Sequence, residues 1–213
     1  ETGGIKLHYN KHVLVRRNVV HGTIDSPGLW VDHSNVNTRV TANIVIGAKS
    51  QFGGIFLEAS YWPNLIDHNI VWDCDGHAFY QHDYEHLTVA HNLFGRCTKK
   101  PVFMRSGGKR VVDIETNRLA TAAHNRVLGN IFYGFEQGPD LPRGDNVSDY
   151  NIFVTPPTGK PFDLAAWRTK TGREANSLVS TSDMELSSLY CALRQTPLVP
   201  ILRLPRLPSI TFD

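Results

Sequence analysis

Five short segments of the chain align residue by residue, and their first residues lie 24, 26, 23 and 24 positions apart. Each reads as a short strand, and they are Gly4–His8, Gly28–Asp32, Gly54–Glu58, His77–Gln81 and Pro101–Arg105. A strand that recurs at this interval is typical of a solenoid, in which each repeat buries its apolar face against its neighbours. The spacing therefore predicts an all-β chain of about six stacked coils.

The alternation of side chains within these segments predicts which face is buried. The second and fourth positions are nearly all apolar and are expected to fill the interior. The third and fifth positions then face outward in two columns, Lys6/Trp30/Phe56/Phe79/Phe103 and His8/Asp32/Glu58/Gln81/Arg105. The opposite assignment would bury the carboxylates of Asp32 and Glu58 without partners, at a prohibitive cost.

A second repeat, an asparagine between two β-prone runs, runs in step with the first. These asparagines are Asn18, Asn43, Asn69, Asn92, Asn130 and Asn151. We expect them to stack in one bend, where a short polar side chain tolerates a bridge or left-handed backbone and hydrogen-bonds along the solenoid axis. The longest interval, 38 residues, predicts an excursion containing the loop 106–110. The pattern resembles the right-handed parallel β-helix of the pectate-lyase-like superfamily.

Length and charge place few other limits on the chain. The 213 residues fit one domain, and a net charge of +2 indicates neither a nucleic-acid nor a membrane partner. No apolar run approaches the roughly 20 residues of a membrane helix, and no signal peptide opens the sequence. Because the chain starts without Met and inside a coil, we expect a truncated fragment of a longer protein. For this chain we lean toward a cytoplasmic location.

The repeat fades after Asn151, which divides the chain into coils at 1–155 and a different segment at 156–213. The stretch 163–172 predicts a short helix, with Asp163 as its cap and Gly172 as its stop. Prolines from Pro197 onward predict an extended segment packed on the solenoid.

Two of the three cysteines, Cys74 and Cys97, each follow a ladder asparagine by five residues. They are therefore expected on neighbouring coils, about 4.8 Å apart in backbone position, where either a disulfide or two reduced thiols is possible. Cys191 has no predicted partner.

The outward carboxylates suggest a catalytic site. Asp32 and Glu58 occupy equivalent positions on consecutive coils, and a rung spacing of about 4.8 Å is close to the 5–5.5 Å between the carboxyl groups of retaining glycosidases. A solvated surface ladder is the alternative. The neighbouring aromatic column predicts a cover, either a sugar or a missing domain or partner subunit, since exposed apolar patches mark binding surfaces.

Several motifs resemble glycoside hydrolase family 120, the β-xylosidases on a β-helix scaffold. They are Leu29–Asp32, Thr38–Val40, Phe56–Glu58, Pro63 and Leu65–Asn69. The resemblance implies a xylan-degrading retaining hydrolase with Asp32 as nucleophile, Glu58 as acid/base and Glu1 as a sugar contact. His33 stands where that family has Trp, and the segment 59–62 also departs, so other sugars remain open.

We therefore expect substrate contacts from Glu1, His8, Trp30, Gln81, His82 and Arg105, an oligosaccharide partner, and possible homo-oligomers. No metal or cofactor is expected, because the groups around His82–His86 point in different directions on a strand and turn. Two alternatives remain, a uronate lyase that recruits Lys6 or Arg105 as base and a non-catalytic carbohydrate-binding β-helix.

Overall fold

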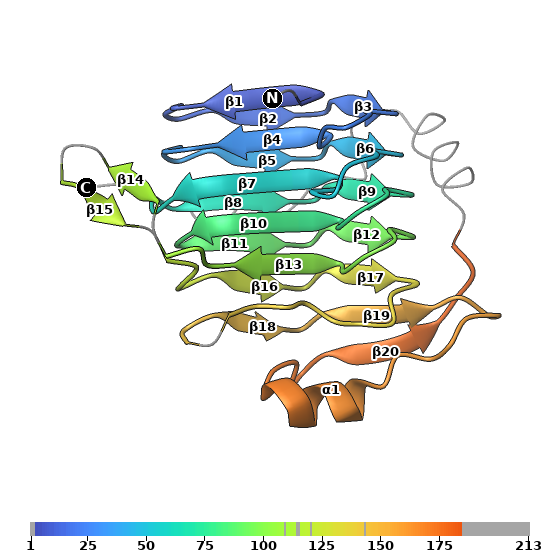
Figure 1. Ribbon diagram of the computed structural model, residues 1–213. Helices are drawn as coiled ribbons and strands as arrows, with labels where there is room; N and C mark the ends of the chain where they lie inside the picture. Colours follow the sequence, from blue (N-terminus) through green and yellow to red (C-terminus); the bar gives the residue numbers. More distant parts are fainter. Residues whose placement is uncertain (1–2, 109, 114–115, 120, 143, 185–213) are drawn as a thin grey trace. The chain divides into compact units, whose positions relative to one another are not determined.

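The computed structural model describes residues 3–108, 110–113, 116–119, 121–142 and 144–184 (Figure 1). Residues Glu1–Ser182 form one compact unit, and Asp183–Asp213 form a second. Within the first unit, parallel strands stack into a β-solenoid of about 7 turns. The predicted fold class, a parallel β-helix, is confirmed, with one turn more than expected. The Pro-rich segment and Cys191 lie outside the described residues.

The described strands of the solenoid form three parallel sheets. The first, the groove sheet, contains β1 (Ile5–His8), β4 (Leu29–Asp32), β7 (Ile55–Ser60), β10 (Phe79–Tyr84) and β13 (Val102–Arg105). The second contains β2 (Leu14–Arg16), β5 (Arg39–Thr41), β8 (Asn64–Asp67), β11 (Leu87–Ala90), β16 (Arg126–Leu128) and β18 (Val147–Asp149). The third contains β3 (Val19–His21), β6 (Ile44–Ile46), β9 (Ile70–Trp72), β12 (Leu93–Gly95), β17 (Ile131–Tyr133), β19 (Ile152–Thr155) and β20 (Leu178–Thr181).

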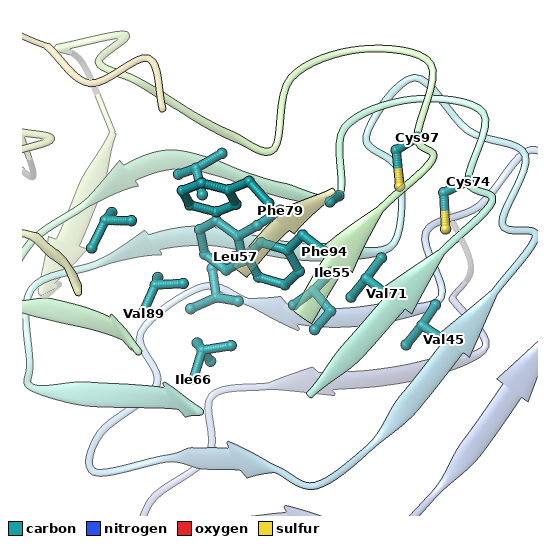
Figure 2. Close-up of a cluster of buried hydrophobic side chains, with 14 of the residues drawn as sticks. Val45, Ile55, Leu57, Ile66, Val71, Cys74, Phe79, Val89, Phe94 and Cys97 are labelled. Carbon is teal, nitrogen blue, oxygen red and sulfur yellow. The ribbon is translucent and has the colours of Figure 1, made fainter. Parts of the chain in front are cut away.

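The interior of the solenoid is filled by alternate side chains from all three sheets. Ile55 and Leu57 of the groove sheet, Ile66 of the second sheet and Val71 of the third are each 0% exposed. Figure 2 shows these side chains converging on one cluster with Phe79 and Phe94. Because each rung adds one apolar side chain per column, the core is continuous along the axis and each coil is stabilised by its neighbours.

The six asparagines of the second repeat stack in the bend between the second and third sheets and form an asparagine ladder. The side-chain amide nitrogen of each of the first five donates to the side-chain oxygen of the next asparagine at 2.9–3.1 Å, and Asn151 ends the ladder by donating to Glu174 Oε2 at 2.9 Å. Each accepting asparagine oxygen also accepts the backbone N–H of the preceding asparagine at 2.9–3.0 Å. The predicted ladder is confirmed.

The left-handed residue of this bend is the one that precedes each asparagine. Its φ is positive at Arg17, Ala42, His68, His91, Gly129 and Tyr150. The asparagine's contribution is therefore to satisfy backbone groups that the bend leaves unpaired. A second series at another bend does the same and was not predicted: the side-chain oxygens of Asn64, Asn125 and Asn146 accept the backbone N–H of Thr38, Leu87 and Asn125, respectively.

The long interval in the asparagine repeat contains an antiparallel hairpin of β14 (Val111–Asp113) and β15 (Arg118–Leu119). We call residues 106–121 the excursion. Helix α1 (Leu164–Thr171) follows the coils (Figure 1). The Asp163 side chain accepts from Ala166 N–H at its start, and Gly172 is left-handed at its end, as the sequence predicts. Within the described part of the chain, no helix is long and apolar enough to cross a membrane.

Candidate functional site

The outward face of the groove sheet carries a column of stacked aromatic rings, one from each of four neighbouring strands. Strand pairing places Trp30 beside Phe56, Phe56 beside Tyr80, and Tyr80 beside Phe103. We call these four residues the aromatic column. The ring centroids of successive pairs lie 5.3, 5.0 and 5.5 Å apart. These are ordinary distances for stabilising aromatic pairs.

The register of strand β10 differs from the predicted one by a single residue. Phe79 pairs with Ile55 and is buried in the core, so Tyr80 takes its place in the aromatic column. Gln81 pairs with Leu57, is 0% exposed and donates from Nε2 to the Tyr84 carbonyl at 2.9 Å. The predictions that Phe79 and Gln81 face outward are therefore wrong. A slip of one residue exchanges the two faces of a strand, which brings His82 into the column with Glu58 and Arg105.

A cavity of about 530 Å³ lies over the aromatic column. It is lined by Asp25, Pro27, Trp30, Gln51, Phe52, Phe56, Glu58, His77, Tyr80, His82, Lys99, Phe103, Arg105 and Arg110. Its volume is within the usual range for small-molecule sites, which are apolar pockets with a few placed polar groups. The groove sheet thus supplies an apolar floor with charged side chains around it.

Most of the aromatic column is covered by the chain itself. Trp30, Phe56 and Tyr80 are only 5%, 2% and 6% exposed. Phe52, from the loop before β7, stacks on Phe56 with a centroid distance of 4.7 Å and an interplanar angle of 6°. The expectation that the column lies exposed is therefore wrong for Trp30 and Phe56, and Tyr80, which was expected in the interior, lies in the covered column instead. Phe52 and Phe103 are half-buried, which makes them the most accessible of the aromatic rings that line the cavity.

The two carboxylates proposed as a catalytic pair lie on adjacent rungs of the groove sheet, since Val31 pairs with Leu57 immediately before them. Each is held by a cation. Lys6 Nζ lies 3.0 Å from Asp32 Oδ2 and 3.7 Å from the centroid of the Trp30 ring. Arg110 Nη1 forms an ion pair with Glu58 Oε1. Glu58 lines the cavity and Asp32 is not among its lining residues.

The excursion brings Arg110 to Glu58 because its backbone is fixed to the coils. His33 Nε2 lies 2.7 Å from the Val111 carbonyl oxygen, and the Ser34 hydroxyl donates to the Val112 carbonyl at 2.6 Å. Sequence reasoning predicted a loop here but not that it would supply Arg110 to the site. The only sequence signal was that a basic residue ends this Gly-rich loop.

A second anchor of the excursion is the fully buried carboxylate of Asp83. Its Oδ1 accepts the backbone N–H groups of Gly107 and Gly108. Its Oδ2 lies 3.3 Å from His82 Nε2. A Cβ at Gly107 would come within 2.8 Å of that nitrogen, so this close approach favours glycine.

Burial lowers the pKa of His82, and the Arg105 guanidinium lowers it further, although Asp83 opposes both. A lowered pKa favours the neutral imidazole at pH 7, which can accept a hydrogen bond from a ligand hydroxyl. Burial likewise lowers the pKa of His77, with help from Lys99 and Lys100, to about 4. The two histidines that line the cavity are therefore uncharged near neutral pH.

The structure brings together four of the predicted substrate contacts or catalytic residues around one cavity, namely Trp30, Glu58, His82 and Arg105. His8 faces outward at the edge of the sheet, with Nε2 3.9 Å from Asp32 Oδ2. Glu1 lies outside the described residues. The lining residues that sequence reasoning missed are Asp25, Pro27, Gln51, Phe52, His77, Tyr80, Lys99 and Arg110.

Cys74 and Cys97 are buried free thiols on neighbouring turns of the third sheet. They lie two residues beyond the paired Trp72 and Gly95, and Thr98 N–H donates to the Cys74 carbonyl at 3.0 Å. A hydrogen bond between the two side chains lowers the pKa of Cys74 and, together with burial, raises that of Cys97. The pair is thus reduced here rather than joined as a disulfide.

Possible metal ligands do not form larger clusters in the described part of the chain. Among the residues that the structure describes, no group of three or more His, Cys, Asp or Glu side chains could hold a metal ion. Two pairs of histidine rings lie side by side, His68/His91 in a tilted and His86/His124 in a stacked arrangement, with ring centroids 5.4 and 4.9 Å apart.

Fold and site together define a parallel β-helix protein with a ligand-sized cavity on one sheet. Residues 1–146 match the family model described as NosD, periplasmic copper-binding protein, and the chain belongs to this family. Neither the search of curated proteins nor the search of solved structures gives a match.

The family assignment corrects two expectations. Its description is periplasmic, so the inclination toward a cytoplasmic location was wrong. The resemblance to glycoside hydrolase family 120 is supported only at the level of the parallel β-helix, and the family match carries no enzymatic activity.

Proposed function

We propose that this protein binds a saccharide in the cavity over the aromatic column. The observation that carries the proposal is the combination of a cavity of about 530 Å³, an aromatic floor and charged side chains at its edge. A sugar ring presents C–H groups on its faces and hydroxyl groups around its rim. The half-buried rings of Phe52 and Phe103 match the faces, and Glu58, Arg105 and Arg110 match the hydroxyl groups.

The charged side chains that line the cavity can bind the hydroxyl groups of a sugar and also the carboxylate of an acidic sugar. Lys99, Arg105 and Arg110 line it together with the two carboxylates of Asp25 and Glu58. Because Arg110 is already paired with Glu58, Lys99 and Arg105 supply most of the positive charge for a ligand. A guanidinium binds a carboxylate through two parallel hydrogen bonds, which would favour a uronate over a neutral sugar.

Retaining hydrolysis of a terminal xylosyl unit is the finer form of this proposal, with Asp32 as nucleophile and Glu58 as acid/base. Its support is that the two residues lie on adjacent rungs. The ion pairs argue for binding without hydrolysis as the primary function. Arg110 occupies Glu58 Oε1 as an ion-pair partner, so this oxygen is not free to donate a proton to a leaving group. Lys6 Nζ is likewise the ion-pair partner of Asp32 Oδ2.

The test is calorimetric titration of the full chain with neutral xylo-oligosaccharides, other neutral oligosaccharides and uronate oligomers. We expect heat of binding with at least one class, and binding about tenfold weaker in Phe103→Ala. The same samples are incubated with aryl glycosides, whose cleavage would support the hydrolase form, and with uronate polymer, where ultraviolet absorption of an unsaturated product would reveal a lyase. Absence of binding to every class would overturn the proposal.

A second candidate function, copper binding, is favoured by the pair of buried thiols at Cys74 and Cys97. The description of the family names copper. Thiolates are soft ligands that select Cu(I), whereas the histidine pairs elsewhere in the described residues offer only imidazole nitrogen atoms. The two thiols are not among the residues that line the saccharide cavity.

A further inference from the structure

The geometry points to a two-coordinate Cu(I) site in which Cys74 and Cys97 are both ligands. This inference rests on the copper-binding candidate and adds the ligands, the oxidation state and the route of entry. Figure 2 shows the two side chains on neighbouring turns, with their sulfur atoms directed the same way. Parallel pairing fixes this arrangement, because equivalent side chains of adjacent rungs project side by side.

The donor set selects Cu(I) among the common metals. Cu(I) accepts two thiolates in a linear arrangement, whereas structural Zn²⁺ requires four ligands and Cu(II) favours a square-planar set of nitrogen and oxygen. The described residues around the thiols contribute no third ligand of the His, Cys, Asp or Glu type. Each sulfur instead lies within 3.5 Å of a backbone carbonyl oxygen, Trp72 for Cys74 and Gly95 for Cys97.

A route to the thiols is present on the Cys97 side. Cys74 is 1% exposed and Cys97 8% exposed, so the pair is shielded from solvent without being sealed. Cys97 lines a second cavity of about 490 Å³ together with His77, Thr98, Lys99, Lys100 and residues 134–137. A metal ion could reach Cys97 first and then be shared with Cys74.

The charge balance of the complex suits these surroundings. Binding of one Cu(I) displaces two thiol protons and leaves a bis-thiolate complex with one net negative charge. No oxidant or reductant is consumed when the metal is delivered as Cu(I). Lys99 and Lys100 line the same cavity as Cys97 and provide compensating positive charge. Burial disfavours such an anion, and a nearby cation, whose attraction is stronger at low dielectric, offsets part of that cost.

The experiment is an anaerobic titration of the reduced full chain with Cu(I) in competition with a chromogenic Cu(I) chelator. We expect one Cu(I) per chain, near-ultraviolet thiolate-to-copper absorption, and protection of two thiols from alkylation. Cys74→Ser and Cys97→Ser should each weaken binding by about 100-fold or more, exceeding the 10–100-fold cost of removing an outer-shell partner. Cys191→Ser is the matched control and should bind as the wild type does. Circular dichroism of each variant checks the fold, and Cys97→Ala provides a second, apolar replacement.

The outcomes separate the two levels of the proposal. If the wild type binds no Cu(I), copper binding fails altogether and the thiol site fails with it. If the Cys74 and Cys97 variants bind Cu(I) as tightly as the wild type, copper binding stands but this site is overturned. Mass spectrometry provides a further check, since a Cys74–Cys97 disulfide that persists in protein prepared from the periplasm under non-reducing conditions would also overturn the site.

Discussion

The asparagine ladder and the column beside the aromatic rings are both built by stacking equivalent positions of successive coils, yet they differ in composition. In the ladder every rung has the same residue with the same hydrogen bonds. In the groove sheet the stacked positions read His8, Asp32, Glu58, His82 and Arg105. Uniform stacking satisfies the backbone and stabilises the fold, whereas varied stacking places different charges side by side. The varied column is therefore the place to look for function.

The largest expected effect comes from breaking the ladder at its centre. Asn69→Ala removes the acceptor of the Asn43 backbone and side-chain N–H groups and the donor to the Val40 carbonyl. All three are buried, and each unsatisfied group costs roughly 1–3 kcal/mol, so we expect a loss of about 3–5 kcal/mol in the free energy of unfolding. Urea denaturation measures it.

The control for this substitution is Asn18→Ala at the first rung, where the side chain is only half-buried. Water can replace the lost hydrogen bonds there, and we expect a cost of about 1 kcal/mol or less. Equal losses at Asn18 and Asn69 would show that burial of the ladder is not what makes it stabilising.

A smaller effect is expected from the ion pair that flanks the ladder on the second sheet. Arg39 Nε and Nη2 donate to the two oxygens of Asp67 at 2.9 and 2.6 Å. Burial would raise the pKa of Asp67, but hydrogen bonds from Arg39 and His68 hold it below its ordinary value. Arg39→Gln should cost about 2 kcal/mol at pH 7, less than the 3–5 kcal/mol of a fully buried pair because Arg39 is partly exposed.

The pH dependence of this loss has a definite sign. A carboxyl group whose pKa is lower in the folded state stabilises the protein above its unfolded pKa, and this contribution is lost as the pH falls through the folded pKa. The difference between wild type and Arg39→Gln should therefore shrink below pH 3.8, the ordinary value for Asp67. Arg96→Gln is the matched control, because Arg96 and Asp73 form a comparable pair at 2.8 Å with both side chains exposed. A difference that stays constant down to pH 2 would contradict the assignment.

Substitution of a residue that lines the cavity should reduce saccharide binding more than it reduces the stability of the fold. Phe103→Ala removes a half-buried ring from the cavity, and we expect affinity for the bound saccharide to fall by about tenfold, or roughly 1.4 kcal/mol. Trp62→Ala is the control, since Trp62 is a partly exposed aromatic residue outside the cavity lining. Calorimetric titration compares them. Equal affinities for both variants would place the saccharide elsewhere.

The sequence predicted the fold well because its apolar alternation and its asparagines repeat at nearly constant intervals. It failed at β10, where Ala78, Phe79 and Tyr80 are consecutive apolar or aromatic residues. Alternation cannot determine the register of such a run, and a slip of one residue moved Gln81 to the wrong face.

The site was predicted less completely than the fold because some of its side chains come from segments that are distant in the sequence. Arg110 reaches Glu58 only because the excursion is held by His33 and Ser34, and no local pattern indicates that path. Phe52 likewise covers the aromatic column from a loop. Contacts of this kind depend on tertiary packing rather than on the repeat.

At pH 7 the smallest expected effect comes from the protonation of His77, which becomes large only in acid and is the sharpest probe of the cavity over the aromatic column. Burial, reinforced by Lys99 and Lys100, lowers its pKa from 6.5 to about 4, and its ring stacks on Phe103 at a centroid distance of 4.8 Å. Because the unfolded chain binds this proton more tightly, His77 should cost the protein stability progressively as the pH falls from 6.5 to about 4, and no further below that. His77→Phe retains a ring for stacking and removes the titrating group, so the stability of this variant should not fall between pH 6.5 and about 4 for this reason.

Nuclear magnetic resonance of the His77 imidazole measures its titration directly, with Lys99→Gln as the companion variant. Removing the positive charge of Lys99 should raise the pH at the midpoint of the His77 titration. A midpoint near 6.5 in the wild type would mean that His77 is solvated, and the cavity would then be more open and more positively charged in acid than the buried ring stack implies.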